Sequence, residues 1–227
     1  MARGQGLVYT SPPVDASLRR ALAGALGPSS VLQGGSFLTP TSSEGVAAAL
    51  RIAQENRLPL RLASGAGDAA SAPEGGAVLS LERLAAITID APNGIARAEA
   101  GATLGALGRA LADAGVAVAG LDGRPGGGRV GSLIATGGLP RRSLCGIEAA
   151  LPGGGLVRVG AAVLKDVVGY DVTSLLLGSA GRLAAIIAVH LRLVPAGVRV
   201  ETAPPAGVRP AAELLDVFDP LGILVGG

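Results

Sequence analysis

The chain has 227 residues, which suits one domain or two small lobes that share a core. Apolar residues make up 49% and aromatic residues 2%, so the expected core is built from Leu, Val, Ile and Ala. The net charge of +2, the lack of a basic run and the scarcity of aromatic side chains argue against a nucleic-acid partner.

Targeting and cysteine patterns point to one compartment. Residues 1–15 contain no apolar stretch of the kind found in signal peptides, and no apolar run reaches membrane length. Cys145 is the only cysteine, which rules out an internal disulfide and a cysteine metal cluster. We therefore predict a cytoplasmic protein without a transmembrane segment.

Hydrophobic periodicity predicts alternating helices and strands. The predicted helices span residues 14–26, 41–57, 104–114, 171–177 and 211–217, and the second begins with Thr41 and Glu44 as a capping box. The predicted strands span residues 31–32, 58–62, 77–81, 87–90, 95–100, 147–151, 156–159 and 183–194. Residues 91–94 read as a hairpin turn and residues 196–210 as a linker. Hairpins among the helices favour a two-lobed α+β protein over a regular doubly wound sheet.

A first glycine-rich segment, residues 64–70, follows a predicted strand and fits G-x-G-x-x-A. A Rossmann site would need a helix to begin inside this motif, but Pro73, Gly75 and Gly76 leave room for barely one turn. We reject that interpretation. A loop of small residues can also hold phosphate through its backbone amides, and an ordinary surface turn is the alternative.

Two further segments stand out by their spacing. Residues 126–142 combine small residues with Pro140, Arg141 and Arg142. Residues 165–171 read K-D-V-V-G-Y-D and continue into G-S-A-G at residues 178–181. This last stretch resembles the K-N-V-x-G-Y-D … G-S-x-G-x-L pattern of the FAD-binding half of the vanillyl-alcohol-oxidase (PCMH-type) flavoproteins. Within that superfamily it is most similar to the glycolate oxidase subunits, above all the E subunit.

The resemblance implies a two-lobed PCMH-type fold that binds FAD noncovalently, with residues 64–68 and 128–132 on the diphosphate. It implies one FAD-binding domain over residues 1–227, with lobes at about residues 28–100 and 101–195 and a linker and tail at 196–227. The implied cofactor-binding residues are Ala63, Ser64, Gly65, Ala66, Gly67, Asp68, Gly128, Arg129, Gly131, Ser132, Ala135 and Ile186. The premise is that two small-residue turns offer unpaired amides to the diphosphate.

Departures from the family's pattern shape the functional hypothesis. The cap domain of the family should follow Pro195, where only a linker and tail are present. The single histidine, His190, reads as a structural or surface residue, and we identify no catalytic residue and no metal site. Residues 184–188 are apolar where the family reads G-V-I-T-E, and residues 217–222 echo its terminal F-D-P-x-G.

Two hypotheses remain open. The first is a non-catalytic or electron-relay FAD-binding subunit of a glycolate or 2-hydroxy-acid oxidase complex, with a larger FAD-containing catalytic subunit and an iron–sulfur subunit as partners. Such partners would place it in the cytoplasm or at the periphery of the inner membrane. The second is a flavin-free assembly subunit on the same fold. A stand-alone oxidoreductase is the weakest reading, because nothing in the sequence would orient and deprotonate a hydroxy acid.

Overall fold

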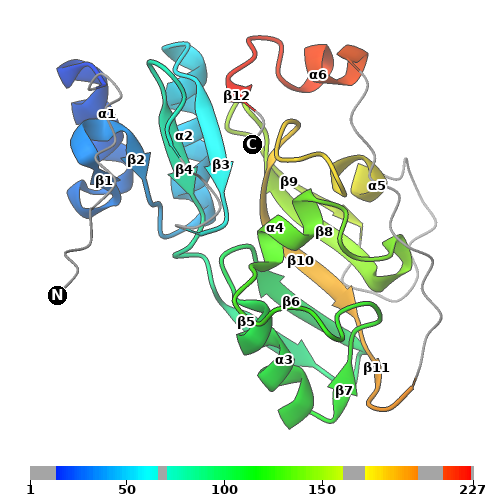
Figure 1. Cartoon of the computed structure of the whole chain (residues 1–227). Coiled ribbons are helices and arrows are strands. Elements are labelled where there is room, and N and C mark those ends of the chain that lie inside the picture. Colours follow the sequence, from blue (N-terminus) through cyan, green and yellow to red (C-terminus); the bar gives the residue numbers. More distant parts are fainter. Residues whose placement is uncertain (1–13, 66–70, 161–171, 199–211, 226–227) are drawn as a thin grey trace, which may run out of the picture.

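The computed structural model describes residues 14–65, 71–160, 172–198 and 212–225. In this part of the chain, two five-stranded sheets lie side by side, each with helices on one face (Figure 1). The large side chains that are fully buried are all Leu or Ile, which confirms the aliphatic core. The two-lobed α+β architecture predicted from the sequence is therefore present.

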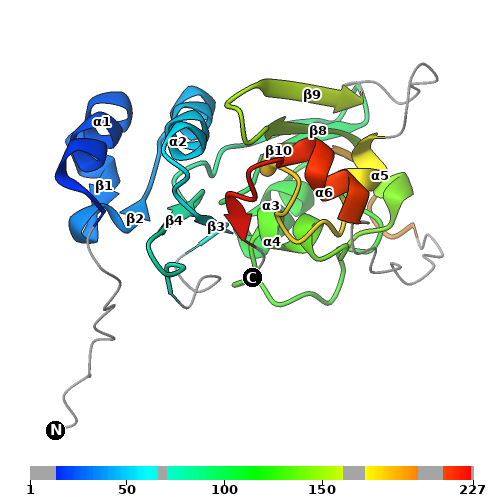
Figure 2. The same cartoon turned by 90° about the horizontal axis from the view of Figure 1, so that it is seen from above.

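The first sheet has the order β1-β2-β4-β3-β12, and only β1 is antiparallel to its neighbour. Its strands are β1 (Val31–Leu32), β2 (Phe37–Leu38), β3 (Leu60–Ala63), β4 (Ala77–Ser80) and β12 (Leu224–Val225). Helices α1 (Ala16–Leu26) and α2 (Ser43–Glu55) pack on one face, as Figure 2 shows from above. The 3-10 turns η1 (Pro28–Ser30) and η2 (Gln33–Gly35) flank β1.

Helix α2 buries the predicted stripe, since Val46, Ala49, Leu50 and Ala53 are all 0% exposed. The predicted capping box was wrong. The helix starts at Ser43, so Ser42 is the N-cap residue and its hydroxyl accepts from the Gly45 amide at 3.1 Å. An N-cap side chain reaches the third helical residue, and from Ser42 that residue is Gly45.

The second sheet is antiparallel throughout, with the order β5-β6-β10-β8-β9. Its strands are β5 (Ile87–Asp90), β6 (Ile95–Glu99), β8 (Leu144–Ala150), β9 (Leu156–Gly160) and β10 (Ala185–Arg192). The predicted hairpin at residues 91–94 is confirmed: β5 pairs with β6, and Gly94 adopts a φ of 68°. Helices α3 (Leu104–Asp113), α4 (Val130–Ala135) and α5 (Val172–Leu176) pack against this lobe, and η3 (Arg141–Ser143) precedes β8.

Two pairings bring distant parts of the sequence together. The expected long strand ends at Arg192, and β11 (Val194–Pro195) instead pairs with β7 (Val116–Ala117). After α6 (Ala212–Phe218), β12 joins the first sheet beside β3. The second sheet begins at Ile87, ahead of the lobe boundary expected near residue 100. Within the described ranges, no helix has the length and apolar character to cross a membrane.

Candidate functional site

A cleft of about 180 Å³ lies where the two lobes meet. The end of β3 and the residue after β4 form its first-lobe wall, and α4, the turn at residues 178–181 and the start of β10 form the opposite wall. The lining residues are small or apolar, or carry a hydroxyl group: Leu62, Ala63, Ser64, Leu81, Gly131, Ser132, Ala135, Thr136, Ala180, Gly181, Ala184 and Ile186. No ionisable side chain is among these lining residues.

The cleft gathers six of the twelve cofactor-binding residues expected from the resemblance: Ala63, Ser64, Gly131, Ser132, Ala135 and Ile186. Gly65 and Arg129 lie next to each other beside it. Gly128 does not line the cleft; it packs near Leu104. Ala66, Gly67 and Asp68 lie outside the described residues, as does the K-D-V-V-G-Y-D stretch at residues 165–171.

The two walls approach each other closely because residue 131 is a glycine. A Cβ atom at Gly131 would lie 2.6 Å from the Ser64 Oγ and 2.9 Å from the Ala100 Cβ. Both separations are far below van der Waals contact. Gly131 therefore lets the start of α4 lie directly against the end of β3.

Most amides of the second glycine-rich turn are already bonded within the protein. The Gly128 amide donates to the Pro125 carbonyl at 3.1 Å, the Val130 amide to Ala102 at 3.0 Å and the Gly131 amide to Ala100 at 2.8 Å. Three of the five amides of residues 128–132 are thus already used, so this turn offers fewer unpaired amides than expected. These amides anchor α4 to the loop after β6 instead, because the first amides of a helix have no partner within the helix.

Ser132 differs from its neighbours. Neither its amide nor its hydroxyl has a hydrogen-bond partner within the described ranges, and the residue faces the cleft. A serine in this position offers two adjacent donors. Among the amides of residues 128–132, those of Arg129 and Ser132 have no hydrogen-bond partner in the described part of the chain, and Ser132 adds a hydroxyl group to its amide.

Arg129 supplies positive charge at the same place. Its Nη1 donates to the Gly101 carbonyl at 2.5 Å, and its Nε lies 2.8 Å from where a Cβ of Gly65 would be. The guanidinium therefore covers Gly65 of the first glycine-rich loop while its backbone begins α4. A guanidinium has the charge and the paired donors that suit a diphosphate, which the resemblance places on these two glycine-rich loops.

The turn at residues 178–181 contributes more than the sequence indicated. The Gly178 amide donates to Ile134 and the Ala180 amide to Ala135, both at 2.9 Å, which fixes the end of α4. Ala180 and Gly181 then line the cleft with φ values of 53° and 71°. The cofactor-binding residues expected from the sequence did not include these two, nor Leu62, Leu81, Thr136 and Ala184.

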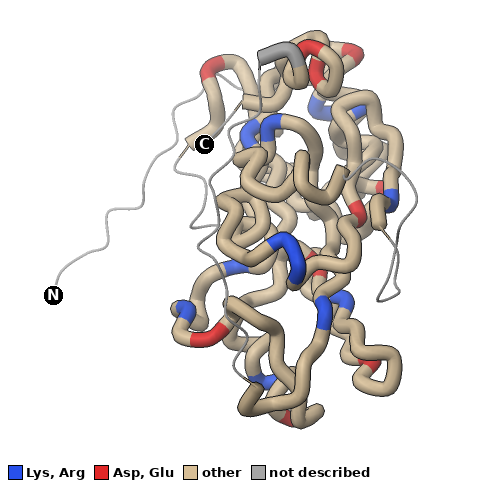
Figure 3. Tube along the Cα trace, turned by 90° about the vertical axis from the view of Figure 1, so that its right-hand side faces the viewer, with Lys and Arg blue, Asp and Glu red and all other residues tan. Residues whose placement is uncertain are grey.

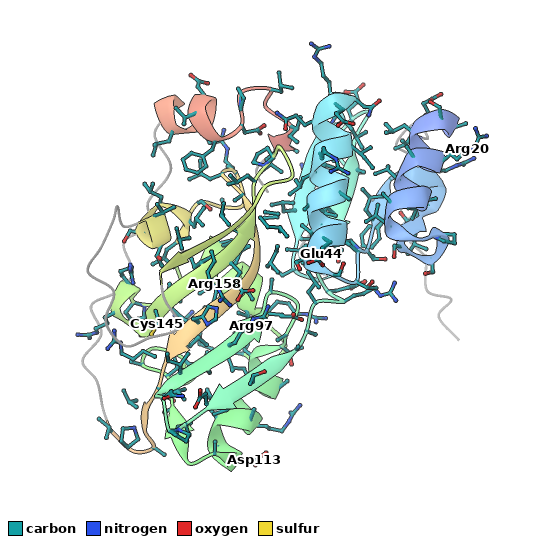
Figure 4. The ribbon with its side chains drawn as sticks, turned by 180° about the vertical axis from the view of Figure 1, so that it is seen from behind. Arg20, Glu44, Arg97, Asp113, Cys145 and Arg158 are labelled. Carbon is teal, nitrogen blue, oxygen red and sulfur yellow. The ribbon has the colours of Figure 1, made fainter. Side chains whose placement is uncertain are left out.

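His190 lies on the opposite face of the second sheet, away from α3 and α4. Its Nε2 is 2.8 Å from the Glu148 Oε1, and Glu148 also binds Arg97 and Arg158, each at 2.7 Å (Figure 4). The hydrogen bonds, those from Arg97 above all, hold the pKa of Glu148 well below its usual value. His190 is buried and bonds within this cluster, as expected for a structural residue.

Other reactive groups give no catalytic arrangement. Cys145 is buried, and burial raises the pKa of its thiol. Among the described residues, no cluster of His, Cys, Asp and Glu could hold a metal ion. Acidic and basic residues are interspersed along the chain (Figure 3). The described lining of the cleft presents apolar side chains and hydroxyl groups to a ligand.

A family model described as FAD binding domain matches residues 36–160. An uncharacterized FAD-linked oxidoreductase of Mycobacterium tuberculosis is 34% identical over 168 residues, which are 69% of this chain and 37% of that protein. D-lactate dehydrogenase of Archaeoglobus fulgidus is 34% identical over 170 residues, 69% of this chain and 38% of the enzyme. Glycolate oxidase subunit GlcD of Bacillus subtilis is 40% identical over 58 residues, covering 26% of this chain and 12% of the subunit.

The fold also matches solved structures. That of 4-ethylphenol oxidase from Gulosibacter chungangensis has a TM-score of 0.65 at 20% identity and covers 82% of this chain and 45% of the oxidase. This likeness confirms the fold. The chain spans well under half the length of the two longer-matching relatives above.

Proposed function

Starting from the fact that this chain belongs to the PCMH-type FAD-binding domain family, with FAD as its cofactor, we propose that it is a non-catalytic or electron-relay flavin subunit. The complex it serves would oxidise glycolate or another 2-hydroxy acid. Bound in the cleft, FAD supplies a centre that accepts and passes on electrons.

One observation carries this proposal: the residues lining the cleft include no ionisable side chain. Oxidation of a hydroxy acid needs a base for the hydroxyl proton and a cation that orients the carboxylate. The described walls offer three hydroxyl groups, those of Ser64, Ser132 and Thr136, whose ordinary pKa is far too high for a base at neutral pH. The described lining of the cleft therefore suits a flavin and offers neither the base nor the cation that would activate the substrate.

The residues present fit FAD held without a covalent bond. Ser132 would donate its amide and hydroxyl to the diphosphate, and Arg129 would neutralise part of its charge. Ala63, Ala135 and Ile186 keep the walls small and apolar, which suits a flat ring system. The close contact of Gly131 with Ser64 keeps the two lobes near enough to bind one ligand together.

The partners follow from relatives. Similarity to glycolate oxidase subunit GlcD over 58 residues supports membership of a multisubunit oxidase. We propose a larger FAD-containing catalytic subunit and an iron–sulfur subunit as partners, with the complex in the cytoplasm or at the periphery of the inner membrane. The iron–sulfur subunit would accept the electrons.

The test begins with purified chain. Flavin released by heating should be FAD, and the FAD-loaded chain mixed anaerobically with glycolate or D-lactate should keep its oxidised flavin spectrum, although dithionite reduces it. Bleaching by either hydroxy acid would refute the non-catalytic role. Co-purification from the source organism should bring down a protein with additional flavin and one with iron and acid-labile sulfide; a chain that purifies alone would refute the complex.

The flavin-free assembly subunit remains the second candidate. The bonded amides of Gly128, Val130 and Gly131 and the apolar residues 184–188 favour it, and the FAD binding of the family argues against it. Colourless protein that binds partner subunits but rejects added FAD would decide for assembly.

A further inference from the structure

The segment from Ala212 to Val225 packs on both lobes at once. On α6, the side chains of Leu214, Leu215 and Phe218 pack against the core of the second lobe. Shortly after Phe218, Ile223 and Leu224 are 2% and 5% exposed within the core of the first lobe. Figures 1 and 2 show this red segment reaching from α6 to the edge of β3. We call residues 212–225 the interlobe clasp.

Asp219 forms the corner of the clasp. The residue is 6% exposed, and its carboxylate accepts the Ile223 amide through Oδ1 at 3.0 Å and the Leu224 amide through Oδ2 at 2.7 Å. Its own amide donates to Leu215 at 2.8 Å. One buried side chain therefore links the end of α6 to the start of β12, and a buried carboxylate needs such partners to be tolerated.

Strand β12, whose start is held by Asp219, pairs with β3, and the end of β3 lines the cleft. The Leu60 amide donates to the Ile223 carbonyl at 2.6 Å, and Leu224 and Val225 pair in register with Leu60 and Arg61. The next residues of β3, Leu62 and Ala63, line the cleft. Leu62 also faces Gly181 of the opposite wall, since a Cβ added at Gly181 would lie 3.4 Å from the Leu62 Cδ1.

We propose that the interlobe clasp sets the separation of the two cleft walls, and that Asp219 is a positioning residue for FAD binding. This inference rests on the proposed FAD seat and adds a residue remote from it. Asp219 is not among the lining residues, its side-chain hydrogen bonds go to Ile223 and Leu224, and it acts through β12 and β3. Because coupling between two sites is reciprocal, bound FAD should in turn tighten the clasp.

The decisive variants are Asp219→Ala and Asp219→Asn. We expect Asp219→Ala to weaken FAD binding by about tenfold or more, the scale of losing hydrogen bonds to a charged group, and Asp219→Asn to lie between it and the wild type. The matched control is Asp15→Ala. Asp15 likewise accepts two backbone amides, from Ser17 at 2.9 Å and Leu18 at 3.3 Å, but it is exposed and caps α1, none of whose residues lines the cleft.

The dissociation constant of FAD and the melting temperature of the apoprotein are measured for each variant. If Asp219 has only a structural role, Asp219→Ala and Asp219→Asn should lower the melting temperature and leave the FAD affinity unchanged. That result would overturn the proposal. A second measurement needs no variant: hydrogen exchange at the Ile223 and Leu224 amides of the wild type should slow when FAD is added. Unchanged hydrogen exchange at saturating FAD would also overturn the proposal. Because this measurement uses the wild type, it remains decisive if Asp219→Ala does not fold.

Failure of the clasp is distinguishable from failure of the proposed function. If the wild-type chain binds no FAD, the proposed function itself is wrong, whatever the Asp219 variants do. If the wild type binds FAD and substitution of Ser132 weakens that binding, but the Asp219 variants bind normally, then only the clasp is wrong.

Discussion

Replacing Ser132 with alanine tests the phosphate seat directly. The variant removes one hydroxyl that faces the cleft and has no partner in the described part of the chain, so the apoprotein should melt as the wild type does. A hydrogen bond to a charged group contributes about 1.5 to 3 kcal/mol. Its loss should raise the dissociation constant of FAD by about 10- to 150-fold, since about 1.4 kcal/mol corresponds to a factor of ten.

The assay is titration of apoprotein with FAD, followed by quenching of flavin fluorescence, with Thr136→Ala as the control. Thr136 lines the same cleft one turn along α4, but its hydroxyl already donates to the Ser132 carbonyl at 2.8 Å. The control should therefore change FAD affinity little. Equal losses for both variants, or no loss for Ser132→Ala, would show that the diphosphate does not lie at the start of α4.

Three further predictions follow from the packing and charge of the two lobes. Gly131→Ala should destabilise the apoprotein by about 1–3 kcal/mol and abolish FAD binding, because the new Cβ overpacks against Ser64 and Ala100. The control is Gly24→Ala, whose new Cβ meets no atom within 4 Å; it should leave FAD binding unchanged and leave the stability unchanged or slightly raised. The pKa of Glu148 is lowered in the folded protein, so its contribution to the free energy of unfolding is complete above its usual pKa of 4.5 and is lost as the pH falls below that value. Urea titrations at several pH values should show the free energy of unfolding of the wild type falling with pH in this range, and falling less steeply in Glu148→Gln. Leu50→Ala should cost about 2–5 kcal/mol in the same titration, since Leu50 is 0% exposed in the first-lobe core, and a smaller loss would mean that α2 is loosely packed.

Local sequence signals predicted local structure well. The hairpin of β5 and β6 needs only two alternating runs and a turn, and the buried stripe of α2 needs only helical periodicity. The contribution of β12 was not predictable in this way, because its pairing with Leu60 joins residues more than 160 positions apart in the sequence. Short apolar segments carry no information about which distant strand edge they will complete.

The candidate site shows the same division. The glycine-rich segments marked where the walls would be, but the sequence gave no indication that the Val130 and Gly131 amides bond to the loop after β6. Those bonds depend on the approach of Ala100 and Ala102, which the folded second sheet alone determines. The sequence could predict which residues line the cleft in part, but not which of their backbone amides are already hydrogen-bonded within the protein.

The bonded amides change the physical basis of the proposed seat. Since the backbone of this turn offers few unpaired amides, side chains must supply further donors to a diphosphate, and two are in position to do so. Arg129 brings a full positive charge over Gly65, and Ser132 adds a hydroxyl beside its own available amide. Charged donors form hydrogen bonds about twice as strong as neutral ones, so a seat with fewer amides can still bind FAD. Its affinity would then depend on the position of these two side chains, and hence on the separation of the lobes that carry them.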